Sequence, residues 1–290
     1  MRLFTFVLLS FSLVFADQKL SKNFFIFQGD VISIQRSKIE SPDTLKGQET
    51  KIALSDESLT FHHMKTDETA LRFEVGHEWF HIDWKENPNF CRENFHLIIG
   101  QVGFFTDHFE NWWILFMTGL AFDLKNIQFK WFSQWRTTFY ARYNYHNKFR
   151  IHVGLLGYLG FRYNEVYPII GIDFNWKKLQ VNLVFPQNIA LEYKINPTIV
   201  PYVKLRFMTQ ARRLDKDEPR SLGAFRYEAT GLEGGLRFVI KKYANLDVYV
   251  GHTGLIVHPR LRVEGRNGTN RIWYDIKSSF YGGISFFVPF

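Results

Sequence analysis

The sequence predicts an all-β protein, a single antiparallel β-barrel of the transmembrane type with an N-terminal extension. Three observations predict this fold: an export-type start, a two-residue alternation of apolar and polar side chains from Leu71 onward, and an aromatic content of 18% beside 22% charged residues. A membrane barrel needs this composition, because its strands carry an apolar outer face, aromatic girdles and a polar inner face together.

The first residues have the features of a secretory signal peptide. Arg2 precedes an uncharged apolar run over residues 3–16, and small residues stand before Asp17. The run is shorter than the roughly 20 residues that a membrane-spanning helix needs, and no later segment is long and apolar enough to be one. We therefore expect residues 1–16 to be removed after Sec-type export. The single cysteine, Cys91, forms no internal disulfide.

The rest of the chain divides at about residue 68. Residues 17–68 combine a strand-like segment, NFFIFQGDVISIQ, with the polar stretch SKIESPDTLKGQETK, and we interpret them as an N-terminal extension, periplasmic or made of early strands. Residues 69–290 form the barrel domain. Turn signals recur there about every 10 to 16 residues, which predicts about 12 strands, with a range of 10 to 14.

The alternation predicts which face of each strand meets the lipid. Leu183 and Phe185 share one face of their strand while Asn182 lies on the other, and Phe225 and Tyr227 oppose a charged face in the same way. If the apolar faces meet lipid, a set of basic side chains points into the lumen. These candidates are Arg142, Arg150, His152, Lys204, Arg206, Arg226, Arg237 and Lys241.

Two readings of this basic lumen remain open. Unpaired, the side chains would favour the passage of small anionic solutes. Paired with acidic residues such as Asp173, Glu192, Glu228 and Glu233, they would instead fill a narrow barrel. By contrast, the segment RRLDKDEPRS, residues 212–221, has the charges of a solvated exterior turn.

The C-terminus predicts the closing strand. The side chains on its apolar face are Phe280, Ile284, Phe286, Val288 and Phe290. An alternating terminal strand that ends on Phe resembles the assembly signal of Gram-negative outer-membrane proteins, which implies the barrel assembly machinery as a partner. Pro289 is tolerated, since the last position of a strand needs few ladder bonds.

A longer segment carries a family resemblance. Residues 165–207, EVYPIIGIDFNWKKLQVNLVFPQNIALEYKINPTIVPYVKLRF, resemble a family of uncharacterised Gram-negative outer-membrane β-barrel proteins, known as a domain of unknown function. The resemblance rests on the PIIG opening, a Trp before the next strand and an FPQ-type turn. It implies the barrel fold and a location in the outer membrane, and it carries over no catalytic residue.

One enzyme motif competes with this interpretation. His77, Glu78 and His81 have the H-E-x-x-H order of zinc peptidases, in which a helix brings both imidazoles to one metal ion. The position where the similar aminopeptidase-type enzymes carry their third ligand is Gly100. The flanking alternation predicts a strand, which would separate the two histidines by about 13 Å. We therefore expect no metal, no cofactor and no enzyme activity.

Three functions follow, in order of preference. The first is an outer-membrane barrel, either structural or a small channel that leans toward anions. The second is a zinc-dependent hydrolase that uses the HEWFH motif, and the third is a soluble exported β-sandwich that binds a ligand. The net charge of +8 is better matched to anionic lipid head groups or solutes than to nucleic acid, because an exported protein does not meet nucleic acid.

Overall fold

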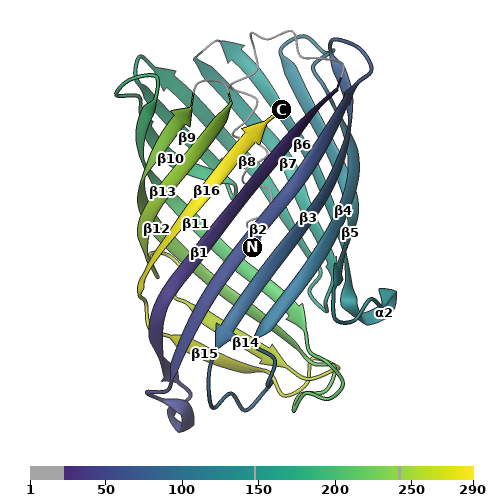
Figure 1. Ribbon diagram of the computed structural model, residues 1–290, viewed down its shortest axis with the longest axis vertical. Coiled ribbons are helices and arrows are strands. Elements are labelled where there is room, and N and C mark those ends of the chain that lie inside the picture. The colour runs from purple at the N-terminus through teal and green to yellow at the C-terminus, as the bar shows by residue number, and fades with distance from the viewer. Residues whose placement is uncertain (1–22, 147, 241–242) are drawn as a thin grey trace.

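The chain folds into one closed antiparallel β-barrel with strongly tilted strands (Figure 1). The computed structural model describes residues 23–290 except residues 147, 241 and 242. The expected signal peptide, residues 1–16, and the lumen candidate Lys241 lie outside the described residues. No described helix is long and apolar enough to span a bilayer.

Fourteen strands close the ring, each paired with its neighbour along the chain until the last strand, β16, pairs with β1. The strands of the ring are β1 (Asn23–Ser41), β2 (Glu49–Met64), β3 (Thr69–Asp83), β4 (Asn94–Thr106), β5 (Trp112–Asp123), β6 (Ser133–His146), β7 (Phe149–Gly160), β8 (Glu165–Trp176), β9 (Leu179–Phe185), β10 (Asn188–Tyr193), β11 (Ile199–Arg213), β12 (Ala224–Ile240), β13 (Ala244–Thr253) and β16 (Phe280–Pro289).

Two short strands lie beyond this ring. β14 (Arg260–Glu264) pairs with the first residues of β12, and β15 (Ile272–Ile276) pairs with the last residues of β1. β14 continues in the direction of β13 along β12, and β15 continues in the direction of β16 along β1, both toward the same end of the barrel. The helical elements are single turns in the connections, η3 (Asp43–Leu45) and α2 (Phe129–Phe132).

The expected strand number was too low, because β1 and β2 belong to the wall. Residues 23–64 form these two strands, and the barrel begins at Asn23 rather than at residue 69. The alternation is weak there for a local reason: the first half of the outer face of β2 carries Ala53, Ser55 and Glu57, and large apolar residues begin only at Leu59. The polar stretch that seemed to end the extension contains the connection between the two strands, residues 42–48.

The two ends of the barrel differ. At the termini end, the upper end in Figure 1, Phe25 and Phe290 exchange two backbone hydrogen bonds of 2.7 and 2.9 Å. The connections there are short, such as residues 65–68 and 177–178, whereas residues 84–93, 214–223 and 265–271 form longer ones at the opposite, long-loop end. Outer-membrane barrels have this asymmetry, with short turns on the periplasmic side and longer loops outside.

The outer face is a continuous apolar band. On β8, Val166 and Ile170 are each 63% exposed while Ile169 between them is fully buried. The same alternation extends around the ring, and the exposed apolar side chains include Phe27, Val31, Leu59, Val75, Val102, Phe104, Phe139, Val153, Leu155, Leu183, Leu191, Val203, Leu236, Val248, Val250 and Ile284. A soluble protein rarely exposes so large a patch. The predicted β-sandwich is wrong, because the strands form one closed ring and not two stacked sheets.

Candidate functional site: the filled lumen

Those of the predicted lumen-facing basic side chains that the structure describes lie inside the barrel, and most of them have acidic partners. Arg206 of β11 crosses the interior to Asp30 of β1, with 2.5 Å between Nη1 and Oδ2, and also pairs with Glu233 of β12. The Tyr281 hydroxyl donates to Glu233 at 3.0 Å, and the Tyr249 hydroxyl donates to Asp30. These groups form one buried network that links five strands, β1, β11, β12, β13 and β16.

Glycines make room for this network. A Cβ on Gly231 or Gly251 would lie 2.5 or 2.4 Å from the Tyr281 side chain, closer than real Cβ atoms approach. The ring of Tyr281 therefore lies flat over two neighbouring strands. This position carries its hydroxyl to Glu233, so the glycines are part of the site although they bear no side chain.

A second set of pairs lies nearer the termini end. Arg237 bonds Asp247 and Glu192 at 3.0 Å each. Arg150 lies 3.5 Å from Asp173.

The remaining candidates of this region lie beside them. His152 joins Asp173 to the Tyr140 hydroxyl, which is 2.5 Å from its Nδ1. The guanidinium of Arg142 stacks on Trp113, and Lys204 lies directly opposite Glu233 across the β11–β12 ladder. The lumen therefore carries near-balanced charge instead of a purely basic lining.

The long-loop half of the lumen contains an ion-pair cluster that the sequence reasoning missed. Glu78 of β3 is fully buried and pairs with Arg136 of β6 at 2.7 Å and Arg212 of β11 at 3.3 Å. Arg212 is fully buried too, although it begins the segment expected to be a solvated turn. The alternation contained the signal for Glu78, since it falls on the face opposite His77, but nothing local marks Arg212.

This arrangement also rules out the zinc-peptidase geometry. His77 points outward and bonds Glu57 at 2.9 Å and His96 at 3.1 Å, and His81 is also on the outer face, near Asn94. Glu78 points the other way, into the lumen. Among the described residues no group of three or more His, Cys, Asp or Glu side chains is arranged to hold a metal ion.

Part of the wall folds into the barrel. The inner sheet, as we call it, consists of residues 208–213 of β11, 224–229 of β12, β14 and β15. Its β11 and β12 segments are covered on both faces. Phe225 packs on Phe80 and Phe95 of the β3–β4 wall, with ring centroids 5.3 and 4.9 Å apart. On the other face, Arg226 contacts Glu165 and the Tyr167 hydroxyl of β8. The prediction that Phe225 and Tyr227 meet lipid is therefore wrong.

The inner sheet leaves a gap in the backbone ladder of the wall. The β9–β10 hairpin turns at Pro186, so β8 pairs with β9 only from Ile170 onward, and β11 pairs with β10 only as far as Leu205. Residues 165–169 and 206–213 thus form the two edges of the gap. Side chains bridge it instead, chiefly the ion pair of Arg226 with Glu165.

The long loops hold the inner sheet from outside. Arg92 of the β3–β4 loop lies 3.0 Å from Asp123 and 3.5 Å from Asp215, and Lys125 lies 2.7 Å from Asp215. The hydrogen bond to Asp215 raises the pKa of Lys125 above its usual value. Asp215 is 2% exposed, so the β11–β12 turn is packed under the neighbouring loops.

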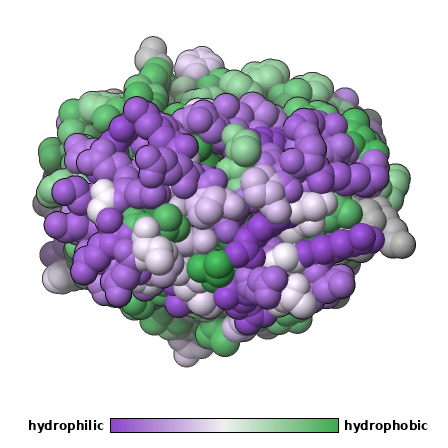
Figure 2. All heavy atoms as spheres, turned by 90° about the horizontal axis from the view of Figure 1, so that it is seen from below, coloured by the Kyte–Doolittle hydropathy of each residue, from purple (hydrophilic) through white to green (hydrophobic). Residues whose placement is uncertain are grey.

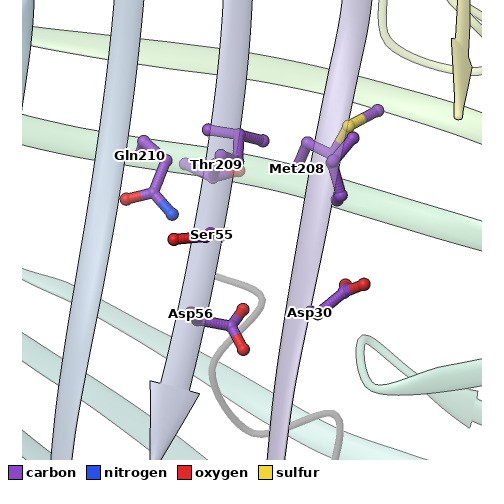
Figure 3. Close-up of a pocket in the computed structure, with 8 residues that line it drawn as sticks. Asp30, Ser55, Asp56, Met208, Thr209 and Gln210 are labelled. Atoms are coloured by element: carbon purple, nitrogen blue, oxygen red, sulfur yellow. The ribbon is translucent and has the colours of Figure 1, made fainter. Parts of the chain in front are cut away.

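Side chains cover the long-loop end. Viewed from below, that end is largely hydrophilic, and apolar side chains lie around its rim (Figure 2). Small pockets lie between the β1–β2 wall and the inner sheet, and one of them is lined by Asp30, Asp56 and Met208. Asp30 and Asp56 lie side by side on the wall, and Met208, Thr209 and Gln210 belong to the strand that crosses behind them (Figure 3).

These features define the class of the protein: a closed β-barrel with an apolar outer band, a polar filled lumen and an inner sheet at its long-loop end. No family model matches the sequence, and no curated protein matches it. Among solved structures, an outer membrane channel from Pseudomonas putida F1 is similar at 10% identity and a TM-score of 0.47, covering 94% of this chain and 97% of that one. The Pseudomonas putida toluene transporter TodX is similar at 10% identity and a TM-score of 0.41, covering 96% and 91%. Similarities at this level describe the general barrel shape and carry no inference about function.

Proposed function

We propose that this chain is an outer-membrane β-barrel channel that is closed at its long-loop end by the inner sheet. The apolar band supports the membrane location, since membrane barrels carry an outward-facing apolar band, typically about 25 Å tall, that matches the bilayer core. The asymmetry of the connections supports the outer membrane, with Asn23 and Phe290 on the periplasmic side. The exposed face of the terminal strand, from Phe280 to Phe290, is the surface that the barrel assembly machinery would recognise.

The observation that carries the channel function is the gap in the backbone ladder. Because no backbone hydrogen bond joins residues 165–169 to residues 206–213, the inner sheet is attached to the β8 side by side chains alone. It can therefore move away from β8 without breaking the ring of strands above it. A purely structural barrel would gain nothing from an interrupted ladder.

Planar-bilayer recording of the refolded chain tests this function. Arg226→Gln removes the ion pair with Glu165 across the gap, and we expect it to raise the frequency of channel openings severalfold over wild type. Arg260→Gln is the matched control, because Arg260 pairs with Glu228 within the inner sheet and does not cross the gap. If neither wild type nor Arg226→Gln conducts at any voltage, the barrel is structural and the channel is refuted.

The preference for anions belongs to the same proposal. Arg150, His152, Arg206 and Arg237 each have a carboxylate partner, so little net positive charge is left to select anions. We expect only a weak anion preference. A reversal potential close to zero in a tenfold potassium chloride gradient would agree with this expectation, and a large anionic reversal potential would contradict the near-balanced lumen.

A further inference from the structure

A cluster of arginines at the long-loop end has too few carboxylates. Arg162 of the β7–β8 turn, Arg262 of β14 and Arg271 of the 265–271 connection all surround the single carboxylate of Glu264, at 3.3, 3.9 and 3.4 Å. We call these three arginines the Glu264 cluster. One carboxylate neutralises only one of them.

The strand register increases the repulsion. Arg262 lies directly opposite Arg226 in the β12–β14 ladder, on the same face of the inner sheet. Like charges at directly opposite positions of an antiparallel pair destabilise the sheet. Arg226 has its own partners in Glu165 and Glu228, so these do not relieve Arg262. The fold therefore holds an excess of positive charge at the Glu264 cluster. This excess does not stabilise the protein in the absence of a bound anion.

A buried tyrosine lies within the same cluster. Tyr163 is 5% exposed, and its hydroxyl oxygen interacts with the Arg262 guanidinium. The proton of that hydroxyl finds no acceptor among the described residues. The Arg262 guanidinium lies 4.5 Å from the centre of the Tyr163 ring, and Arg226 lies 5.9 Å from it. An acceptor oxygen placed here would meet both the tyrosine donor and the guanidinium groups.

The cluster is reachable from outside. The side chain of Arg271 is 52% exposed and that of Arg162 is 32% exposed, whereas Glu264 beneath them is 3% exposed. Arg162 lies against Gly268 of the 265–271 connection, where a Cβ would come within 2.3 Å of its guanidinium. A ligand thus approaches from the long-loop end through an exposed rim toward a buried floor.

We propose that the Glu264 cluster, with Tyr163, is a binding site for an anion that bears a phosphate group. Phosphate fits because it carries more than one negative charge and several acceptor oxygens, and because arginine binds it through two parallel hydrogen bonds. A single carboxylate would duplicate Glu264 and leave the excess charge in place. The site goes beyond the proposed channel, since binding requires no conduction.

Titration calorimetry on the refolded full chain in nonionic detergent at low salt tests the site, with inorganic pyrophosphate as the free probe. We expect saturable binding that Arg262→Gln and Arg162→Gln each weaken about tenfold, the effect of losing one charge-assisted contact. The matched control is Arg36→Gln, which removes one positive charge from an exposed pair with Asp83 and Glu49 away from the cluster. Arg36→Gln should change the affinity for pyrophosphate by no more than a factor of about two, because salt screens the interaction between distant surface charges.

Glu264→Gln gives a change of opposite sign. Removing the only carboxylate of the cluster should tighten pyrophosphate binding severalfold, which a merely unfolded variant cannot do. Folding of each variant is checked by the mobility shift between heated and unheated gels. If an arginine variant fails to fold, Glu264→Gln decides alone, and unchanged or weaker binding overturns the proposal.

A second titration separates the sources of the phosphate. Detergent micelles that contain phosphatidic acid present the same group on a lipid. Binding of pyrophosphate with the expected variant pattern assigns the site to a free phosphate compound, and the same pattern only with the lipid assigns it to a head group. Saturable binding of neither probe, or equal weakening by Arg36→Gln, refutes the site.

Discussion

The β8–β9 wall and the inner sheet contain the same two-residue alternation and place it in different surroundings. In β9, Leu183 and Phe185 face outward while Asn182 is buried in the lumen. In β12, Phe225 and Tyr227 are also apolar residues at alternate positions, yet both are buried against the β3–β4 wall. Alternation therefore identifies the two faces of a strand but not the medium that each face meets.

The largest difference between the regions should appear when a buried charge loses its partner. Glu78→Ala leaves Arg136 and Arg212 in the lumen without their shared carboxylate, and we expect a loss of about 3 to 5 kcal/mol in the free energy of unfolding. Urea unfolding of the refolded barrel measures it. A loss below about 1 kcal/mol would mean that water already reaches these arginines and that the long-loop half is not packed.

Truncating an aromatic residue compares the two regions directly. Phe225→Ala should cost about 3 kcal/mol, since it opens a cavity between packed rings of the protein. Phe185→Ala on the outer wall should cost much less, because lipid chains fill the space that the ring leaves. Equal losses in the same urea experiment would contradict the assignment of Phe225 to the interior.

A charged substitution on the outer face tests whether that face meets lipid. Leu183→Arg should destabilise the barrel by about 2 kcal/mol in bilayers, as arginine does on the lipid-facing side of membrane barrels. Refolding into vesicles, followed by the fraction of heat-shifted protein on gels, reports the effect. The same substitution should be nearly neutral if this face meets water.

The smallest effect concerns the loops that cover the inner sheet. The pKa of Lys125 is raised by Asp215, so the stability that it contributes is fully present below the lysine value of about 10.4 and is lost as the pH rises through the higher folded value. Wild type should therefore lose slightly more stability than Lys125→Met between pH 9 and pH 12, about the range of lysine titration. Identical pH profiles would show that this loop contact is loose.

Much of the fold was predictable from local patterns. The alternation around Leu183, Phe139 and Val203 predicts outward faces, and each of these side chains is exposed. The count failed at β1 and β2 because the outer face of β2 is polar around Glu57. His77 of β3 bonds Glu57 there, and His96 of β4 in turn bonds His77. Only the neighbouring strands make such a face acceptable.

The lumen was predictable in its residue types and not in its pairs. Arg206 stood out as an inward basic residue, but its partner Asp30 is 176 positions away and lies on the far side of the seam where β16 closes on β1. Arg212 and Asp215 had the sequence features of a surface turn, but Arg212 is buried in the lumen beside Glu78 and Asp215 is buried under the neighbouring loops. The local sequence does not show that residues far away in the chain will bury these side chains.

By itself the sequence determined the barrel class, the two faces of most strands and the closing role of the strand that ends at Phe290, because these depend on a short-range period and on side-chain polarity. Only the tertiary structure decided that the wall between β8 and β11 is interrupted, that the lower part of the β11–β12 hairpin turns inward, and that the lumen charges are paired. The reason is physical: the burial of a face and the neutralisation of a charge are set by residues distant in the chain, which only ring closure brings together.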